Sequence, residues 1–343
     1  MATSQPQSLM KAAMLYERNG TWKIVDDVPV PKPGPNDILV RITASSLCMS
    51  DIMAIQGYVD TPLPYCGGHE PVGIIEKLGD GVRGFAIGDR VGFMPATNTC
   101  QQCDSCFSGN HRYCKEKESV GFNGAYGGFS QYCLADPLST VKVPKELSDE
   151  VAAPLFCAGV TAYGAMKKVA KRQIPGSLVN IVGSGGVGHL AIMYAKAMGF
   201  RVHAYDITQD KLDLASHSGA DAVFNSLTML LNKIEQAQST LVISGSIKAY
   251  ELGMDITHDR GAVIAVGAPH ELFPCNVTEM VLRELSLLAT NQGTRQELAE
   301  ALSMAAAHDI IPLIRTRHIG EINEAVKDIT EGKVSGRTVF HMW

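Results

Sequence analysis

The sequence has no long hydrophobic run, no dominant charge and no recognisable targeting segment. No apolar run approaches the ~20 residues of a membrane-spanning helix. The 30 basic and 35 acidic residues are well mixed and leave a net charge of −5, so neither nucleic acid nor a membrane is expected as a partner. The N-terminal stretch MATSQPQSL lacks the apolar core of a secretion signal and the arginines of a mitochondrial one. We therefore expect a cytoplasmic protein.

The chain is rich in glycine, and its cysteines are unevenly spread. The 33 glycines among 343 residues indicate a globular enzyme with many turns, and the length suits two domains. Four of the nine cysteines lie in the short stretch CQQCDSCFSGNHRYC, residues 100–114. Disulfides are rare in the reducing cytosol, where such a cluster more often binds metal.

The spacing C-x2-C-x2-C-x7-C predicts a structural zinc site. Four thiolates on so short a loop can surround one Zn²⁺ tetrahedrally at ~2.3 Å. The four residues are Cys100, Cys103, Cys106 and Cys114. An iron–sulfur cluster and four free thiols are the alternatives, but ferredoxin runs end in x3-C-P, whereas Lys115 follows here. His111 is interpreted as a solvated loop residue. Because a closed zinc site has no open position, reactive chemistry must lie elsewhere.

The secondary-structure pattern changes near residue 155. Before it, the β-rich segments 11–15, 37–45, 71–79 and 89–93 are separated by Pro/Gly/Asp turns and predict an irregular β-barrel or sandwich. After it, strands alternate with helices. The expected strands are 177–183, 201–206, 222–224, 240–245, 262–267 and 285–290, and the expected helices are 186–198, 209–218, 227–238 and 247–256. This α/β alternation predicts a doubly wound parallel sheet. The tail is expected to add helices at 294–307 and near 321–330, and a last strand from residue 337.

The stretch GSGGVG, residues 183–188, predicts a dinucleotide-binding turn. Its glycines are Gly183, Gly185, Gly186 and Gly188, and it follows a buried strand and opens a helix. Such a turn lets the backbone approach a pyrophosphate at a helix N-terminus. A tight strand–helix turn without a ligand is the alternative.

Asp206 lies 23 residues after Gly183, at the end of the next strand. A carboxylate there accepts the adenosine ribose hydroxyls and repels a 2′-phosphate. No arginine follows it to hold such a phosphate. We therefore predict NAD rather than NADP. Lys211 either reaches the same ribose or is a solvated surface lysine.

With a zinc loop upstream of a dinucleotide fold, the chain resembles the zinc-dependent alcohol dehydrogenases of the medium-chain dehydrogenase/reductase family, of the yeast-like microbial type. The motifs that carry the resemblance are GGHEPVG (67–73), GDRVG (88–92), the four-cysteine loop, CAGVTAY (157–163) and GSGGVG. The resemblance implies a GroES-like catalytic domain over 1–156 and 291–343 and a Rossmann NAD-binding domain over 157–290. It also implies a homotetramer, with a homodimer as the alternative.

The resemblance implies a second, catalytic zinc held by Cys48, His69 and Cys157. Without the resemblance, these residues are better interpreted as buried core residues. Glu70 resembles the family glutamate that sits behind the zinc and exchanges with its water ligand, and Asp51 the carboxylate that orients the ligand histidine. An alcohol oxygen would occupy the open position, and hydride would pass reversibly to the nicotinamide.

Further roles carried over from the family concern the proton and the cofactor. Ser50 matches the hydroxyl that takes the alcohol proton. Thr161, Val187 and Val266 match positions that buttress the nicotinamide. Arg337 in SGRTVF matches a pyrophosphate-binding arginine.

Four residues depart from the pattern of well-known alcohol dehydrogenases, and a fifth, Cys157, separates the chain from the polyol dehydrogenases. Met49 replaces a basic residue, and Met53 replaces the histidine that ends the proton relay, so we expect the proton to leave through the cofactor ribose to water. Val59 and Pro95 stand where yeast-type enzymes carry pocket-narrowing tryptophans, which predicts alcohols bulkier than ethanol. Cys157, where polyol dehydrogenases carry glutamate, argues against a sorbitol-like substrate.

Three other interpretations remain at this point. An NADP-dependent aldehyde or cinnamyl-alcohol-type reductase would use the same machinery toward reduction. A zinc-free quinone reductase would lack the ligand set. A non-catalytic NAD-binding protein on the same scaffold would not need it.

Overall fold

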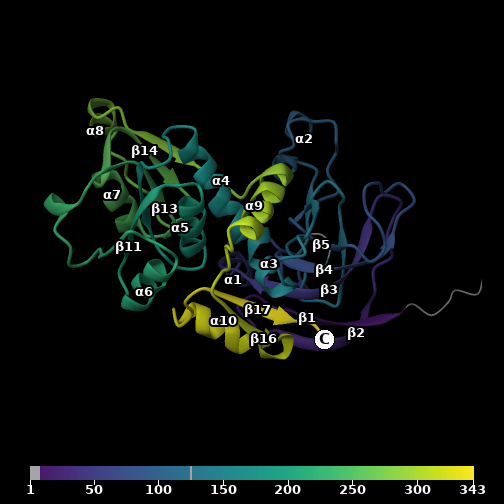
Figure 1. Ribbon diagram of the computed structural model, residues 1–343. Helices are drawn as coiled ribbons and strands as arrows, with labels where there is room; N and C mark the ends of the chain where they lie inside the picture. Colours follow the sequence, from purple (N-terminus) through teal and green to yellow (C-terminus); the bar gives the residue numbers. More distant parts are fainter. Residues whose placement is uncertain (1–7, 124–125) are drawn as a thin grey trace, which may run out of the picture. The chain divides into compact units, whose positions relative to one another are not determined.

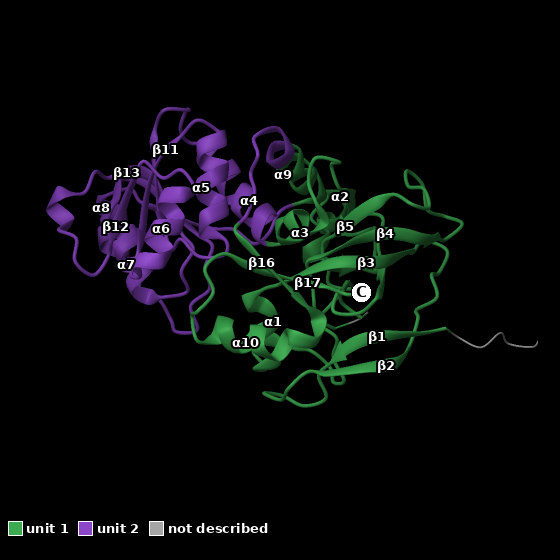
Figure 2. Cartoon of the chain, turned by 60° about the horizontal axis from the view of Figure 1, so that its bottom comes forward, with its two compact units in different colours: residues 1–157, 294–303, 313–343 green, residues 158–293, 304–312 purple. Residues whose placement is uncertain are grey.

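The computed structural model describes residues 8–123 and 126–343, which form two compact units (Figure 2). Of these residues, unit 1 comprises 8–123, 126–157, 294–303 and 313–343, and unit 2 comprises 158–293 and 304–312. No helix in these described ranges is long and apolar enough to cross a membrane.

Unit 1 is built on a seven-stranded sheet in which the C-terminal tail pairs with the N-terminal part of the chain (Figure 1). The order is β16-β17-β3-β4-β5-β9, and β8 pairs with β3. The bounds are β3 Ile38–Leu47, β4 Pro71–Leu78, β5 Arg90–Phe93, β8 Tyr132–Ala135, β9 Thr140–Lys142, β16 Ile314–His318 and β17 Arg337–His341. Strand β17 runs antiparallel to β3, with Thr338 opposite Leu47. This mostly antiparallel sheet agrees with the β-rich pattern of the sequence before residue 155.

Two small ribbons and short helices complete unit 1. The ribbons are β1 Leu9–Met14 with β2 Lys23–Pro29, and β6 Ala96–Thr97 with β7 Glu118–Ser119. The helices are α1 Met49–Ile55, α2 Asp104–Phe107, α3 Asp149–Ala152, α10 Ile322–Thr330 and the 3-10 turns η1 His111–Tyr113, η2 Ala153–Phe156 and η4 Ile319–Glu321. Helix α9 Arg295–Ala307 contributes residues to both units.

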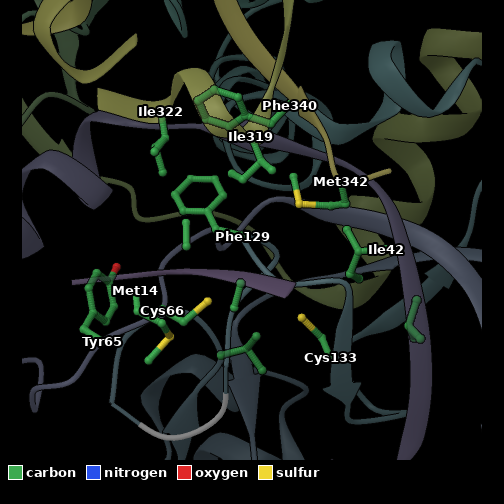
Figure 3. Close-up of a cluster of buried hydrophobic side chains, with 14 of the residues drawn as sticks. Met14, Ile42, Tyr65, Cys66, Phe129, Cys133, Ile319, Ile322, Phe340 and Met342 are labelled. Carbon is green, nitrogen blue, oxygen red and sulfur yellow. The ribbon is translucent and has the colours of Figure 1, made fainter. Parts of the chain in front are cut away.

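Phe129 lies in the middle of the core of unit 1 (Figure 3). Its ring centroid is 5.7 Å from that of Trp22 and 5.5 Å from that of Phe340, both edge to face. The thiols of Cys66 and Cys133 belong to the same core. Burial raises the pKa of Cys66 to about 12, so this thiol stays neutral and is a packing group rather than a ligand.

Unit 2 is a six-stranded parallel sheet in the order β12-β11-β10-β13-β14-β15. The bounds are β10 Leu178–Val182, β11 Arg201–Asp206, β12 Ala222–Asn225, β13 Ala237–Val242, β14 Thr257–Ala265 and β15 Ser286–Ala289. Its helices are α4 Ala158–Ala170, α5 Gly188–Ala197, α6 Gln209–His217, α7 Ile247–Asp255 and α8 Val277–Leu282. All five residues of β10 are buried, as expected for a parallel strand covered on both faces. The predicted doubly wound sheet is confirmed, and the chain order reverses direction between β10 and β13.

The predicted helix at 227–238 is wrong. The structure has only the 3-10 turn η3 Leu231–Lys233 there, and Ala237 already begins β13. The apolar residues that suggested a helix face solvent, with Leu227 72% and Leu230 58% exposed. An amphipathic helix is stable chiefly when its apolar face is buried, and these side chains find no such layer.

Candidate functional site

Cys48 lies where β3 passes into α1. It is the N-cap residue of α1, with extended backbone angles, so its side chain stands at the start of the helix. Its backbone N–H donates to Asp51 Oδ2 at 3.0 Å, which fixes the first turn. Cys48 is 8% exposed and Asp51 is fully buried.

His69 follows the Gly67-Gly68 pair and is oriented by the same carboxylate. Asp51 Oδ1 accepts from Gly68 N–H and contacts His69 Nδ1, both at 3.1 Å. Gly68 has φ +91°, and a Cβ there would lie 2.6 Å from Phe129 N, so the approach needs glycine. His69 Nε2 is buried and has no hydrogen-bond partner among the described residues. A buried ring nitrogen with its other nitrogen held by a carboxylate is the arrangement of a metal-ligating histidine.

Cys157 ends the 3-10 turn η2. The preceding Phe156 packs against Gly92 of β5, where a Cβ would lie 2.4 Å from the ring. The glycine of the GDRVG motif therefore makes room for the ring that positions Cys157.

The structure brings together the three predicted ligands and Glu70. One donor atom from each of Cys48, His69, Glu70 and Cys157 lies within 4.8 Å of the others. Cys48, His69 and Cys157 are far apart in the sequence. Their side chains meet because β3, β4 and η2, which flank them, contact one another. A sulfur, sulfur, nitrogen set with a nearby carboxylate suits Zn²⁺.

The electrostatics of this cluster favour a cation. The hydrogen bond from Cys157 holds the pKa of the Cys48 thiol well below its usual value. Burial alone would lower the pKa of His69, but the Asp51 carboxylate raises it well above the usual range. A metal bound here must displace the protons of Cys157 and His69, because only thiolate and neutral imidazole coordinate.

Glu70 is held by Arg337, a pairing that spans the chain. Arg337 Nη2 donates to both carboxylate oxygens of Glu70 and, at 3.1 Å, to Ser46 Oγ. Both side chains are buried, and burial raises the pKa of Glu70 to about 7 despite the guanidinium. The guanidinium predicted to bind a pyrophosphate thus has a carboxylate partner within unit 1.

Helix α1 and its flanks carry the remaining catalytic-domain candidates. Ser50 is half-buried in the first turn, and its Oγ lies 3.9 Å from Cys48 Sγ. Met53 lies one turn further along the same helix. Val59 is half-buried against the core of unit 1, and Pro95 is half-buried at the end of β5.

The four-cysteine loop folds its sulfur atoms together as predicted from their spacing. The Cys100 Sγ–Cys114 Sγ distance is 3.6 Å and the Cys100 Sγ–Cys106 Sγ distance is 4.0 Å. Sulfur atoms around a tetrahedral zinc with Zn–S of ~2.3 Å lie ~3.8 Å apart. The backbone N–H of Cys100 donates to Cys114 Sγ and lowers the pKa of that thiol to about 7. With Cys103 in the same group, the donor set fits one structural zinc.

In unit 2 the glycine turn leads from β10 into α5. Gly183 has φ +96°, and a Cβ on Gly188 would lie 1.9 Å from Gly183 O. A Cβ on Gly185 would meet no described atom within 4 Å. This open space beside the N-terminus of α5 is where backbone N–H groups can bind a phosphate, so the turn fits a dinucleotide. Gly186 and Val187 complete the turn, and Val187 is the N-cap residue of α5.

Asp206 ends the neighbouring strand β11 and is bound to the glycine turn. Its Oδ2 accepts from Ser184 N–H at 2.8 Å, and its Oδ1 accepts from Ile207 N–H at 2.8 Å. The glycine turn and the acidic residue therefore form one rigid unit at the carboxyl ends of β10 and β11.

The other predicted cofactor residues also lie in unit 2. Lys211 is half-buried in the first turn of α6, and Thr161 is half-buried near the start of α4. Val266 follows β14, where its N–H donates to Val242 O at 2.9 Å. Val187 and Val266 both stand at the carboxyl ends of sheet strands, the edge at which doubly wound sheets bind ligands.

Comparison with known proteins matches both parts of the chain. Residues 34–145 match the family described as alcohol dehydrogenase GroES-like domain, and residues 186–307 match the family described as zinc-binding dehydrogenase. An alcohol dehydrogenase of Geobacillus stearothermophilus is 37% identical over 338 residues, covering 96% of this chain and 99% of that protein.

Solved structures give the same result. The alcohol dehydrogenase of the archaeon Aeropyrum pernix is 32% identical with a TM-score of 0.88, over 97% of this chain and 100% of that chain. A cinnamyl alcohol dehydrogenase of Sorghum bicolor is 25% identical with a TM-score of 0.89, over 97% of each chain.

Proposed function

Because the chain belongs to the zinc-binding alcohol dehydrogenases of the medium-chain dehydrogenase/reductase family, we propose that it is an NAD-dependent oxidoreductase that interconverts alcohols with aldehydes or ketones. The observation that carries this proposal is that Cys48, His69 and Cys157 bring their donor atoms together. Among the described residues, the buried Nε2 of His69 in this group has no hydrogen-bond partner. In this proposal, 1–156 and 291–343 form the catalytic domain and 157–290 the NAD-binding domain.

Two zinc ions per chain are part of the proposal. Cys48, His69 and Cys157 would hold the catalytic ion, with Glu70 beside it, and the four-cysteine loop would hold the structural ion. When bound, the catalytic zinc supplies a Lewis acid that polarises the alcohol or carbonyl oxygen. The chain's own contribution is orientation: Asp51 fixes the ring of His69 and the first turn of α1 through one carboxylate.

The proton of the alcohol passes to Ser50 in this mechanism. Its hydroxyl lies in the first turn of α1, with Oγ 3.9 Å from Cys48 Sγ. Met53, on the same helix, has no titratable group and cannot accept this proton; a bound cofactor would supply its ribose hydroxyls as the route to water. Met49, 52% exposed, adds no positive charge for the pyrophosphate.

The preference for NAD rests on Asp206. Its carboxylate is 8% exposed and is held by backbone N–H groups from the glycine turn and its own strand end. A 2′-phosphate beside this fixed negative charge would be repelled. When bound, NAD supplies the hydride acceptor; Lys211 would assist at the ribose, and Thr161, Val187 and Val266 would pack beside the nicotinamide. A pyrophosphate contact by Arg337 stays a prediction.

The substrate is proposed to be a primary or secondary alcohol bulkier than ethanol. Val59 and Pro95 are smaller than the tryptophans of yeast-type enzymes at the positions predicted to line the pocket. A cinnamyl-alcohol-type reductase that uses NADP is the alternative, and the cofactor separates the two.

Self-association and a cytoplasmic location are also proposed. Exposed apolar side chains gather on α8 and on the edge strand β15. They are Val277, Val281, Leu282 and Leu287, with exposures of 67%, 69%, 80% and 39%. An apolar group at a free sheet edge suits burial against another copy. The mass in solution, by light scattering, distinguishes the proposed homotetramer from a dimer.

Initial rates with NAD and NADP across primary, secondary and aromatic alcohols test the proposal. We expect NAD to be preferred, and hexanol or benzyl alcohol to have a higher kcat/KM than ethanol. A preference for NADP with faster aldehyde reduction would favour the cinnamyl-type alternative. Absence of turnover in a protein containing two zinc ions per chain would contradict the proposed function.

A further inference from the structure

Helix α1 and the turn after it, residues 56–61, form a continuous segment that carries the proposed site. The helix begins at Cys48 and includes Ser50, and the turn includes Val59. Asp51 fixes the start of this segment to the zinc-ligand cluster. The turn has few hydrogen bonds of its own, so its far end must be held by another part of the chain.

Arg18 binds the far end at two points. Its Nη1 donates to Ala54 O at 2.8 Å and also to Thr61 Oγ1, and its Nη2 donates to Thr61 O. The next residue, Asn19, donates its backbone N–H to Ile55 O at 3.0 Å. The segment 18–19 therefore holds the last carbonyls of α1 and the end of the turn simultaneously.

Leu15 and Tyr65 close the same connection on the other side of the turn. They exchange two backbone hydrogen bonds of 2.7 and 2.8 Å. Arg18 thus acts from a backbone that is itself anchored next to the turn. The backbone hydrogen bonds from the turn to α1 are confined to its first half: the N–H groups of Gln56, Gly57 and Tyr58 donate to carbonyl oxygens of α1 at 3.0, 3.1 and 2.9 Å.

The electrostatics suit an arginine at this position. Helix α1 has no basic residue in its own last turn, so the guanidinium supplies the positive charge that its C-terminal carbonyls favour. Over residues 8–123 and 126–343, no carboxylate pairs with Arg18. Thr61 is 1% exposed, so bulk water cannot replace Arg18 as the hydrogen-bond partner of its oxygens. Nη1 alone donates to both Ala54 and Thr61, and the second arm of the planar fork adds the bond from Nη2 to Thr61 O. An ammonium has a single nitrogen and would keep only part of this set.

We propose that Arg18 is a positioning residue for substrate selectivity: by binding Ala54 and Thr61 together, it fixes the 56–61 turn and thereby Val59. This inference rests on the proposed function, because it takes Val59 as part of the alcohol pocket. Val59 is only partly buried against the core, so its position depends on the backbone of the turn rather than on tight packing. A small displacement of a pocket residue changes the discrimination between alcohols before it changes the chemistry at the metal.

The test compares Arg18→Ala, Arg18→Lys and Thr61→Val with a matched control, Arg83→Ala. Arg83 also donates to two backbone carbonyls of a turn in unit 1, Asp80 O and Val82 O, but lies outside the site. For each variant, kcat and KM are measured for ethanol and hexanol with NAD. Hydrogen exchange is measured on peptides covering 56–61, and zinc content by elemental analysis.

We expect Arg18→Ala to lower the hexanol-to-ethanol ratio of kcat/KM by roughly tenfold, mostly through the KM for hexanol. Exchange of the 56–61 amides should accelerate while zinc content is unchanged. Arg18→Lys and Thr61→Val should give intermediate ratios, and Arg83→Ala the wild-type ratio. If Arg18→Ala does not fold, the ratios of Arg18→Lys and Thr61→Val decide the question.

Two results would overturn the inference, and they are distinguishable from each other. An unchanged ratio with an equal loss for both alcohols would mean that Arg18 only stabilises the fold. A wild-type protein that contains zinc but oxidises no alcohol would refute the proposed function itself, and that result is read from the wild-type sample alone.

Discussion

At the scale of single residues, Asp51 controls the geometry of the proposed catalytic site. Its two oxygens bind Cys48 N–H, Gly68 N–H and His69 Nδ1, so one buried carboxylate sets two predicted zinc ligands. We expect Asp51→Asn to weaken zinc binding at this site by roughly 10–100-fold, since partners of metal-ligating histidines contribute that much. Elemental analysis after dialysis against a weak chelator should then find about one zinc per chain.

The control for this change is Asp221→Asn in unit 2. The Asp221 carboxylate also accepts a backbone N–H, from Val202 at 2.7 Å, and it pairs with Lys196. This variant should lose some stability yet keep both zinc ions. Equal zinc retention in the Asp51 and Asp221 variants would contradict the orienting role of Asp51.

Met53 gives a second prediction at the residue scale. Ser50 and Met53 are three residues apart on α1 and so share a face of the helix. Met53→His would add an acceptor for the Ser50 proton. A free imidazole has a pKa of about 6.5 and accepts a proton only when neutral, so the gain in alcohol oxidation should exist above this pH and vanish below it. A pH–rate profile of Met53→His, compared with Ser50→Ala/Met53→His, measures the gain; identical profiles for wild type and Met53→His would refute it.

The donor atoms of both predicted ligand groups lie together in the structure, whereas some pairings within the site were not predicted. The four-cysteine loop is local, so its spacing alone indicated a metal site. Cys48, His69 and Cys157 were proposed only through the resemblance, because residues so far apart in the sequence leave no spacing to recognise. The Glu70–Arg337 ion pair was missed: its partners are 267 positions apart, and only the pairing of β3 with β17 brings that tail to the site.

At the scale of elements, we predict that the lobe of residues 96–119, which contains α2, depends on a structural zinc held by its four thiols. Its only regular structure is short: α2, η1 and the two-residue strands β6 and β7. We expect Cys103→Ala to release the structural zinc and reduce stability first, with activity lost only as a consequence. A loss of about 3 kcal/mol would lower the Tm by roughly 6–12 °C for a domain of this size.

Cys133→Ala is the matched control for the lobe. Cys133 is a fully buried core thiol whose pKa burial raises, and it lies in the hydrophobic cluster rather than in a ligand group. It should lose packing energy but no zinc. If Cys103→Ala kept two zinc ions and the wild-type Tm, the structural assignment would be wrong.

The elements of unit 2 show where sequence patterns succeed and fail. The fully buried strand β10 is apolar except for Asn180, and it was predicted closely. The 227–238 segment has apolar residues near helical spacing, but Leu227 and Leu230 remain exposed and β13 begins at Ala237. Helix periodicity in a short segment is therefore insufficient when no layer is available to bury the apolar face.

At the scale of the whole molecule, the two proposed ligand types belong to different units. All the thiols and the histidine proposed as zinc ligands lie in unit 1, whereas the glycine turn and Asp206 lie in unit 2. The hydrogen bonds that fix the glycine turn, Gly183 N–H to Tyr205 O and Ser184 N–H to Asp206 Oδ2, are internal to unit 2. Zinc loss should therefore leave this turn intact.

We predict that removal of zinc and removal of Asp206 act independently. Protein stripped of zinc by a chelator should still bind NADH, within about threefold of the wild-type Kd, but oxidise no alcohol. Asp206→Ala should show the converse pattern: two zinc ions per chain and a Kd for NADH weakened by roughly tenfold or more, because the ribose loses its acceptor and the turn loses a hydrogen bond. NADH fluorescence titrations measure both constants.

At ligand concentrations of 100 times Kd, bound NADH should stabilise the stripped protein by about 2.7 kcal/mol, which a thermal shift detects. Loss of NADH binding on zinc removal would instead mean that the nucleotide site depends on the metal-bound unit, and the division of roles between the units would have to be abandoned.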